Sequence, residues 1–313
     1  MNNQDHINIY HFINYERSDL IFYINSLMKF NVTVCFDLED SVQDIFLPEY
    51  NSALKQKARA KIKEIFQLKN FPGIGSGIRL NSFPTNEINS DLEFLSELKE
   101  LTHINSILLP KTESREEVES LLKALDKFEV KIQEIIPIIE TQNGFNNLSS
   151  IIANRNEMLK RIAFGHCDFN HDKNIFPFFH QNSKEYWEWI KEIVSITEPA
   201  GIEIINSPFL KLNDDKSYNS MLSKLTHFCK GSFGQITLTY RQVELCEIFR
   251  FQKRQLNGFN KNLSVTEISD YAQEIIRDYE SHNMKKGFSV TEANKTLISP
   301  HEYISAKKYL SRV

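Results

Sequence analysis

Short apolar runs alternate with helix-length amphipathic segments along most of the chain, and this alternation limits the possible folds more than any other feature. The clearest case lies between residues 135 and 169. Residues 135–139 and 161–165 are apolar, β-branched and too short for helices, whereas residues 143–152 between them have helical spacing. Such strand–helix–strand units are typical of a buried parallel sheet.

Counting along the chain gives eight strand–helix pairs, spaced by roughly 30 to 40 residues within about 250 residues, as a TIM barrel requires. No GxGxxG pattern follows the first strand, which argues against a Rossmann domain. The sequence therefore predicts a (β/α)8 barrel over residues 1–254. The expected strands are residues 7–13, 32–36, 78–81, 104–109, 135–139, 161–165, 202–205 and 232–238.

Residues 255–313 are predicted to form a C-terminal helical arm, with helices near residues 265–282 and 301–310. A segment of this length can bury little core of its own. We expect the arm to pack on a neighbouring subunit or over the mouth of the barrel.

Composition excludes several classes of function. The formal net charge of −4 provides no basic field for nucleic acid. No apolar run is long enough for a membrane span and the first residues do not resemble a secretion signal, so the cytoplasm is expected. The four cysteines are dispersed without a CxxC pair, which argues against a zinc site and against a disulfide framework.

Charged residues follow the predicted strands two to six, namely Asp37, Arg79, Lys111, Glu140 and Asp168. In a parallel barrel these positions lie on one rim, where ligands bind. Charged side chains are rarely buried without partners, so a cluster of them at one rim is hard to explain by packing alone.

Glu140 and Asp168 each follow an apolar run, and we interpret them as ligands of one Mg²⁺ ion. The alternative is that they form structural salt bridges. A cation held by two carboxylates keeps positions open for substrate oxygens, and it would stabilise negative charge on oxygen when a neighbouring C–C bond is made or broken.

Arg79 has the planar fork that suits a substrate carboxylate, and the alternative is an ion pair with Asp37. We expect Asp37 either to hold a residue that contacts the metal or substrate, or to bind substrate itself. Glu39 is expected to pair with Arg79 or Lys111. The alternative is that these acids are charges at the start of a helix. Lys111 contacts either substrate or other side chains. His166 could transfer protons, and Thr141 and Asn143 could contact the metal site or cap the next helix.

Five motifs carry a resemblance: FDLEDSVQD at residues 36–44, IRLNS at 78–82, ILLPKTES at 107–114, IIETQNG at 138–144 and AFGHCDF at 163–169. In this order and spacing the chain resembles the HpcH/HpaI aldolase and citrate lyase beta-subunit family over roughly residues 7–251. The resemblance implies a barrel that binds Mg²⁺ through Glu140 and Asp168 and a substrate carboxylate through Arg79. It also implies reversible cleavage of a 3-hydroxy acid or its CoA thioester by a trimer or hexamer.

The chain departs from the family at four places. Ile13, Asn14 and Tyr15 replace a Pro-Gly turn, Cys167 replaces an acid, Leu238–Thr239–Tyr240 replaces Ile-His-Pro, and Ser299 replaces an acid before a Pro-His pair. Three of these changes fall where CoA or the acid-base group is expected. The resemblance therefore supports Mg²⁺ and the carboxylate site more strongly than CoA.

The sequence thus predicts a Mg²⁺-dependent carbon–carbon lyase acting on a small hydroxy or keto acid, with CoA in doubt. A barrel that keeps the ligand pocket but has lost catalysis, and serves in binding or assembly, is the alternative. A lyase subunit whose substrate is presented by a carrier protein is the third reading.

Overall fold

The computed structural model describes most of the chain. The described residues are 6–44, 46–69, 71–98, 104–153, 156–229, 232–259, 265–282, 289–290, 297–298, 303, 306–307 and 310–311. By their contacts the residues form two compact units, Met1–Phe251 and Gln252–Val313. The dividing point is three residues before the predicted one and lies within a helix.

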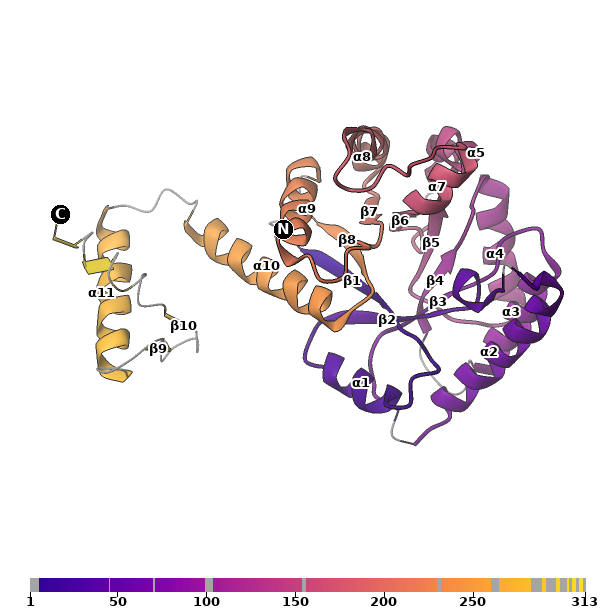
Figure 1. Cartoon of the computed structure of the whole chain (residues 1–313), viewed down its shortest axis with the longest axis horizontal. Coiled ribbons are helices and arrows are strands. Elements are labelled where there is room, and N and C mark those ends of the chain that lie inside the picture. The colour runs from indigo at the N-terminus through magenta and orange to yellow at the C-terminus, as the bar shows by residue number, and fades with distance from the viewer. Residues whose placement is uncertain are drawn as a thin grey trace. The chain divides into compact units, whose positions relative to one another are not determined.

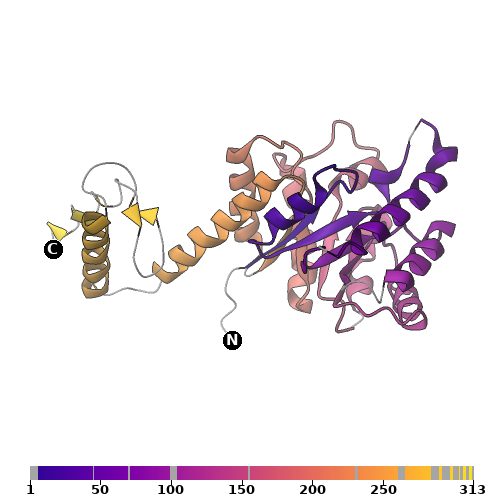
Figure 2. The same ribbon diagram turned by 90° about the horizontal axis from the view of Figure 1, so that it is seen from below.

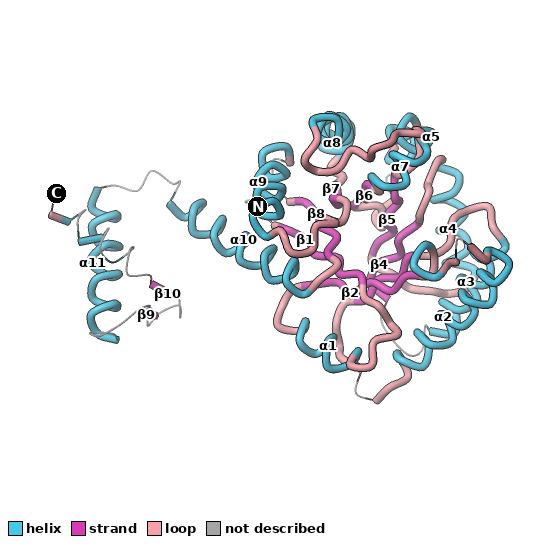
Figure 3. The backbone as a smooth tube through the Cα atoms, in the orientation of Figure 1, coloured by secondary structure: helices cyan, strands magenta, loops and turns pink. Residues whose placement is uncertain are grey.

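The first unit is a closed parallel barrel in which β1 pairs with β2 and β8 closes the ring on β1 (Figures 1 and 3). The predicted (β/α)8 barrel is confirmed. The strands are β1 (Ile7–Phe12), β2 (Val32–Asp37), β3 (Ser76–Arg79), β4 (Ile104–Leu109), β5 (Glu134–Ile139), β6 (Arg161–Phe164), β7 (Glu203–Asn206) and β8 (Phe233–Thr237).

Helices surround this ring of strands, and a view turned by 90° again places them outside it (Figure 2). They are α1 (Leu20–Leu27), α2 (Asn51–Phe66), α3 (Asn86–Leu98), α4 (Arg115–Lys127), α5 (Gln142–Asn146), α6 (Leu148–Ile152), α7 (His166–Asp172), α8 (Lys184–Thr197), α9 (Asp215–Phe228) and α10 (Tyr240–Phe259). Short 3-10 turns occupy Asp40–Val42, Pro48–Tyr50 and Glu198–Ala200. None of the described helices is long and apolar enough to cross a membrane.

The apolar core lies in two layers, as expected for strands that are buried on both faces. The larger layer fills the space between strands and helices, and the smaller one fills the inside of the barrel. The inner layer includes Leu108, Ile136 and Ile138, and Ile236 belongs to it on the opposite strand. These residues form the floor beneath the open end of the barrel.

Among the described residues, two predicted elements differ from the observed ones by more than one residue at an end. β3 begins and ends two residues before the predicted strand. Ser76 and Gly77 are poor strand formers, so the sequence pattern places the start of the strand after them. In the structure both residues pair with β4, across a register shift. A Cβ at position 77 would lie 3.0 Å from the Cys35 sulfur, so a larger residue there would need a shift of a few tenths of an ångström in that side chain. Arg79 is consequently the last residue of a strand.

The predicted helix at residues 143–152 is two short helices, α5 and α6, because the chain turns at Asn147. Asn147 is both the C-cap of α5 and the N-cap of α6. Asparagine is a poor helix former and favours such terminal positions. The following helix, α7, was not predicted from the sequence.

The second unit contains helix α11 (Val265–His282), with the predicted bounds, and two short antiparallel strands, β9 (Ser289–Val290) and β10 (Leu297–Ile298). Ala272 and Ile275 of α11 are buried. The predicted helix at residues 301–310 and the departure at Ser299 fall largely outside the described residues. Packing on a neighbouring subunit or over the barrel mouth stays a prediction.

Candidate functional site

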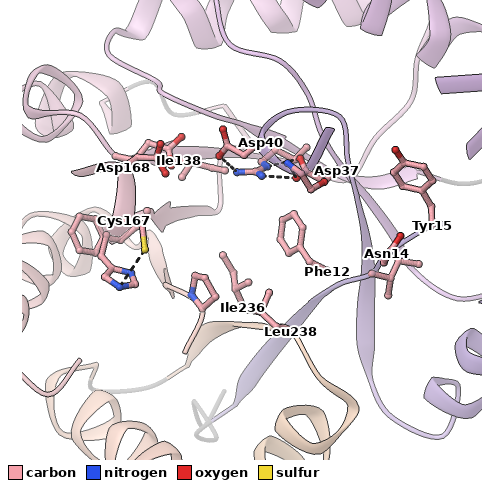
Figure 4. A pocket seen from close by; sticks show the side chains of 18 of the residues that line it. Phe12, Asn14, Tyr15, Asp37, Asp40, Ile138, Cys167, Asp168, Ile236 and Leu238 are labelled. Atoms are coloured by element: carbon pink, nitrogen blue, oxygen red, sulfur yellow. Dashed lines mark hydrogen bonds and ion pairs between the residues drawn. The ribbon is translucent and has the colours of Figure 1, made fainter. Parts of the chain in front are cut away.

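A cavity of about 580 Å³ opens at the carboxyl ends of the barrel strands. Acidic side chains line one side of it, with Asp37 and Asp40 near β2 and Asp168 near β6, and Ile236, Leu238 and Phe12 lie across from them (Figure 4). This is the rim on which TIM-barrel enzymes place their active sites. Arg79 and Glu140 also line the cavity, so the strand-end residues expected to converge do so, with Lys111 beside them.

Glu140 is the first residue after β5, and its carboxylate is held tightly. Its Oε1 accepts a hydrogen bond of 2.8 Å from the backbone N–H of Lys111, whose left-handed backbone (φ 50°) is uncommon outside glycine. Gly165 packs against the other oxygen, since a Cβ there would lie 2.2 Å from Oε2. Burial, followed by the charges of Glu39 and Asp168, raises the pKa of Glu140 well above its usual value.

Asp168 lies in the first turn of α7 rather than in a loop after β6. Its side chain is 35% exposed, and its Oδ1 lies 3.8 Å from the Lys111 ammonium. Burial and the nearby Asp40 raise the pKa of Asp168, against the lowering effect of Lys111 and Arg79. Asp168 is therefore only loosely paired with a cation.

Arg79 is hydrogen-bonded to Asp37, the last residue of β2, and to Asp40 in the turn that follows. Its Nε and Nη2 donate to the two oxygens of Asp37 at 2.7 and 2.5 Å, and its Nη1 donates to Asp40 at 3.1 Å. Burial alone would raise the pKa of Asp37, but the charge and hydrogen bonds of Arg79 lower it to about 2. The ion pair with Asp37 is thus present, and substrate binding by Arg79 and Asp37 stays a prediction.

Lys111 reaches back across the rim to Glu39, with which it forms an ion pair, and lies 3.5 Å from Asp40. Glu39 also lies 3.1 Å from Arg79, so it is a partner of both bases. Burial, with a further contribution from Asp40, raises the pKa of Glu39 to about 7 despite these cations. Substrate binding by Lys111 also stays a prediction.

Taken together, five carboxylates (Asp37, Glu39, Asp40, Glu140, Asp168) surround two cations (Arg79, Lys111). The excess of negative charge and the hard oxygen donors suit a divalent cation such as Mg²⁺. No group of three or more His, Cys, Asp or Glu side chains placed to hold a metal occurs among the described residues. A cation here would have two carboxylate ligands at most and would take the rest from solvent or substrate.

The remaining candidates have structural partners. Thr141 caps α5, because its hydroxyl accepts the Gly144 N–H at 3.0 Å, and Asn143 donates to Glu113 at 3.3 Å. His166 is buried with its Nε2 3.0 Å from His180, and burial followed by the charge of His180 lowers its pKa to about 3. Its Nδ1 is buried without a hydrogen-bond partner.

The sequence pattern does not predict the apolar side of the cavity, formed by Phe12, Ile236 and Leu238. Phe12 is the last residue of β1 and Leu238 directly follows β8, so both lie at strand ends. Their apolar side chains give no sign of a site in the sequence.

The sequence profile of the HpcH/HpaI aldolase/citrate lyase family matches residues 23–231, which is two thirds of the chain. The chain belongs to this family. The match contains all five motifs and every strand-end residue of the cluster. No curated protein matches the sequence.

Solved structures share the fold of this family member at low sequence identity. RipC from Yersinia pestis is 21% identical over 78% of this chain and 94% of its own, with a TM-score of 0.59. CitE from Mycobacterium tuberculosis, in complex with magnesium, acetoacetate and coenzyme A, is 16% identical over 98% and 97%, with a TM-score of 0.59. The citrate lyase beta subunit from M. tuberculosis, complexed with oxaloacetate and magnesium, is 17% identical over 80% and 99%, with a TM-score of 0.59.

Proposed function

We propose that this protein is a Mg²⁺-dependent carbon–carbon lyase that cleaves or forms a small hydroxy or keto acid. The observation that carries the proposal is the pair Glu140 and Asp168, two carboxylates with raised pKa values on one cavity. Membership of a family of aldolases and citrate lyases supports it. So do two solved complexes of the citrate lyase beta subunit CitE, each of which contains magnesium and a small carboxylic acid.

Each side chain has a defined task in this proposal. Glu140 and Asp168 would hold the cation, which would supply Lewis-acid stabilisation of the oxygen charge that develops when the adjacent C–C bond is made or broken. Arg79 has five N–H donors, of which Asp37 takes two and Asp40 one, while Glu39 lies 3.1 Å from Nη1. The second N–H of Nη2 is the donor that would bind the substrate carboxylate. Asp37 keeps this guanidinium in place.

The test is proton exchange at C3 of pyruvate in D₂O with Mg²⁺, followed by NMR. Stabilisation of the charge on the enolate oxygen would let solvent take a proton from C3 and return a deuteron, so deuterium enters the methyl group. We expect exchange by the wild-type protein and its loss on chelation of Mg²⁺. Glu140→Gln and Asp168→Asn should each lose roughly 100-fold or more, since both remove a cation ligand without changing side-chain volume.

The matched control is Asp172→Asn, four residues further along α7. Asp172 accepts the Gln142 backbone N–H at 2.7 Å outside the cavity, and an asparagine oxygen can replace it there. This variant should exchange at the wild-type rate. Equal losses in all three variants would mean that the barrel fold, rather than a cation site, is being disturbed.

One observation favours a second candidate. Both bases of the cluster are already held by acids of the chain, which suits a barrel that binds ligands or serves in assembly without catalysis. Binding of Mg²⁺ and an acid, measured by isothermal titration, with no exchange of any 2-oxo acid would establish this second function. Titration with acetyl-CoA in the same experiment decides whether a CoA thioester belongs to the substrate.

A further inference from the structure

The side of the cavity opposite the acids is apolar. Ile236 belongs to the apolar layer inside the barrel, and Phe12 packs against that layer. Leu238 extends the surface toward the mouth, where it is 37% exposed. Figure 4 shows Phe12, Ile236 and Leu238 facing the acidic side across the open space.

The cavity is also poor in positive charge. Among the described residues that line it, Arg79 alone carries a guanidinium or ammonium group, and this group is already in contact with Asp37, Glu39 and Asp40. Lys111 lies beside the lining with its ammonium on Glu39. A bound cation and Arg79 can together accept one carboxylate. A second carboxylate would meet acids, the apolar side or uncharged polar groups such as Asn14 and Tyr15. None of these carries a compensating positive charge, and a charge without one is costly to bury.

The cavity exceeds the needs of a three-carbon acid. At about 30 Å³ for each water molecule of the liquid, 580 Å³ corresponds to roughly 20 water molecules. Ile236 and Leu238 line the same cavity, so a chain that extends from the reacting carbons toward them would replace water on apolar surface. Such burial is favourable by its area.

We propose that the substrate is a monocarboxylic 2-oxo or hydroxy acid with an apolar chain, rather than a di- or tricarboxylic acid. The inference rests on the proposed function and names the substrate class of the same site. The carboxylate and its neighbouring oxygen face Arg79, Glu140 and Asp168. The chain lies on Phe12, Ile236 and Leu238.

The test compares two acids of nearly the same shape by isothermal titration of the full-length protein with Mg²⁺ present. In 4-methyl-2-oxopentanoate two methyl groups stand where oxaloacetate has its second pair of carboxylate oxygens. We expect 4-methyl-2-oxopentanoate to bind at least about tenfold more tightly. Along pyruvate, 2-oxobutanoate and 2-oxopentanoate, each added methylene should tighten binding by about threefold to fourfold.

A charge placed on the apolar side provides the second test. Leu238→Arg adds a cation at a half-exposed position that accepts a long side chain, and it should shift the preference toward oxaloacetate by at least about tenfold. Leu212→Arg adds the same charge to an exposed position that does not line the cavity, and the preference should stay as in the wild type.

Oxaloacetate binding as tightly as its apolar counterpart, or an unchanged preference in Leu238→Arg, would overturn this inference. Deuterium exchange of pyruvate separates that failure from failure of the proposed function. Deuterium exchange of pyruvate together with tighter binding of oxaloacetate would support the lyase function and refute the proposed substrate class. No deuterium exchange together with the predicted order of binding would support the proposed ligand class of the cavity and refute the lyase function.

Discussion

At the scale of single residues, the site depends on how closely Gly165 approaches Glu140. The buried carboxylate lies between the Lys111 N–H on one side and the Gly165 backbone on the other. Any residue can adopt the backbone conformation of Gly165 (φ −99°). Glycine is required here because a Cβ would overlap with the Glu140 carboxylate.

Gly165→Ala should therefore displace the Glu140 carboxylate. We expect a loss of about 1–3 kcal/mol in the free energy of unfolding, from overpacking of a buried contact, and weaker Mg²⁺ binding. Urea unfolding and magnesium titration measure the two effects. Gly73→Ala is the control, because a Cβ there has nothing within 4 Å and should change neither. Wild-type Mg²⁺ affinity in Gly165→Ala would show that Glu140 is not a ligand.

The buried pair Arg79–Asp37 makes stability depend on acid pH. The folded pKa of Asp37, about 2, lies below the roughly 3.9 of an unfolded aspartate, so its contribution is complete above pH 4 and is lost as pH falls toward 2. The difference in unfolding free energy between wild type and Asp37→Asn should shrink by about 2 kcal/mol over that window.

Urea unfolding at a series of pH values measures this difference. Asp215→Asn removes the acid of the exposed Arg241 pair and should give a difference close to zero throughout. A constant difference for Asp37→Asn would contradict the account of this pair.

The sequence predicted some of these residues and not others, for physical reasons. Glu140 follows an uninterrupted apolar run, so its place at the end of a buried strand could be predicted. The left-handed backbone of Lys111 depends on a contact with Glu140 that is distant in sequence. Phe12 and Leu238 look like ordinary apolar residues of strands one and eight, and only closure of the barrel brings them opposite the acids.

At the scale of elements, the junction of β6 and α7 sets the position of Asp168. The Ser207 hydroxyl, just after β7, donates to the Phe164 carbonyl and accepts the His166 N–H at 3.1 Å. It thus ties together the two residues that flank Gly165. α7 escaped prediction because residues 166–172 are rich in His, Asp and Asn, which favour loops. These tertiary bonds supply what the local sequence lacks.

Ser207→Ala should loosen this junction and leave the buried His166 N–H unsatisfied, at a cost of about 1–3 kcal/mol. We also expect Mg²⁺ binding weakened by roughly threefold to tenfold, since Asp168 lies in the first turn of the helix. Ser106→Ala removes an equally buried hydroxyl that donates to Glu134 away from the cavity. It should lose stability without losing Mg²⁺ affinity. Equal affinities in both variants would contradict this role of Ser207.

At the scale of the whole molecule, the barrel and residues 252–313 are separate compact units. A unit of about 60 residues buries only about 60% of the surface that its unfolded chain exposes, so its own core gives it marginal stability. The family resemblance predicts a trimer or hexamer to which this unit contributes. Light scattering should find such an assembly for the full chain and a monomer for residues 1–259. A monomeric full chain would contradict the prediction.

The central claim is that a divalent cation lies between Glu140 and Asp168, and anomalous diffraction from crystals soaked in Mn²⁺ and pyruvate tests it most directly. We predict one strong peak about 2.0–2.3 Å from an oxygen of each carboxylate, with pyruvate oxygens completing the coordination. The absence of a peak at this place, with Lys111 and Arg79 still neutralising the acids, would contradict the account.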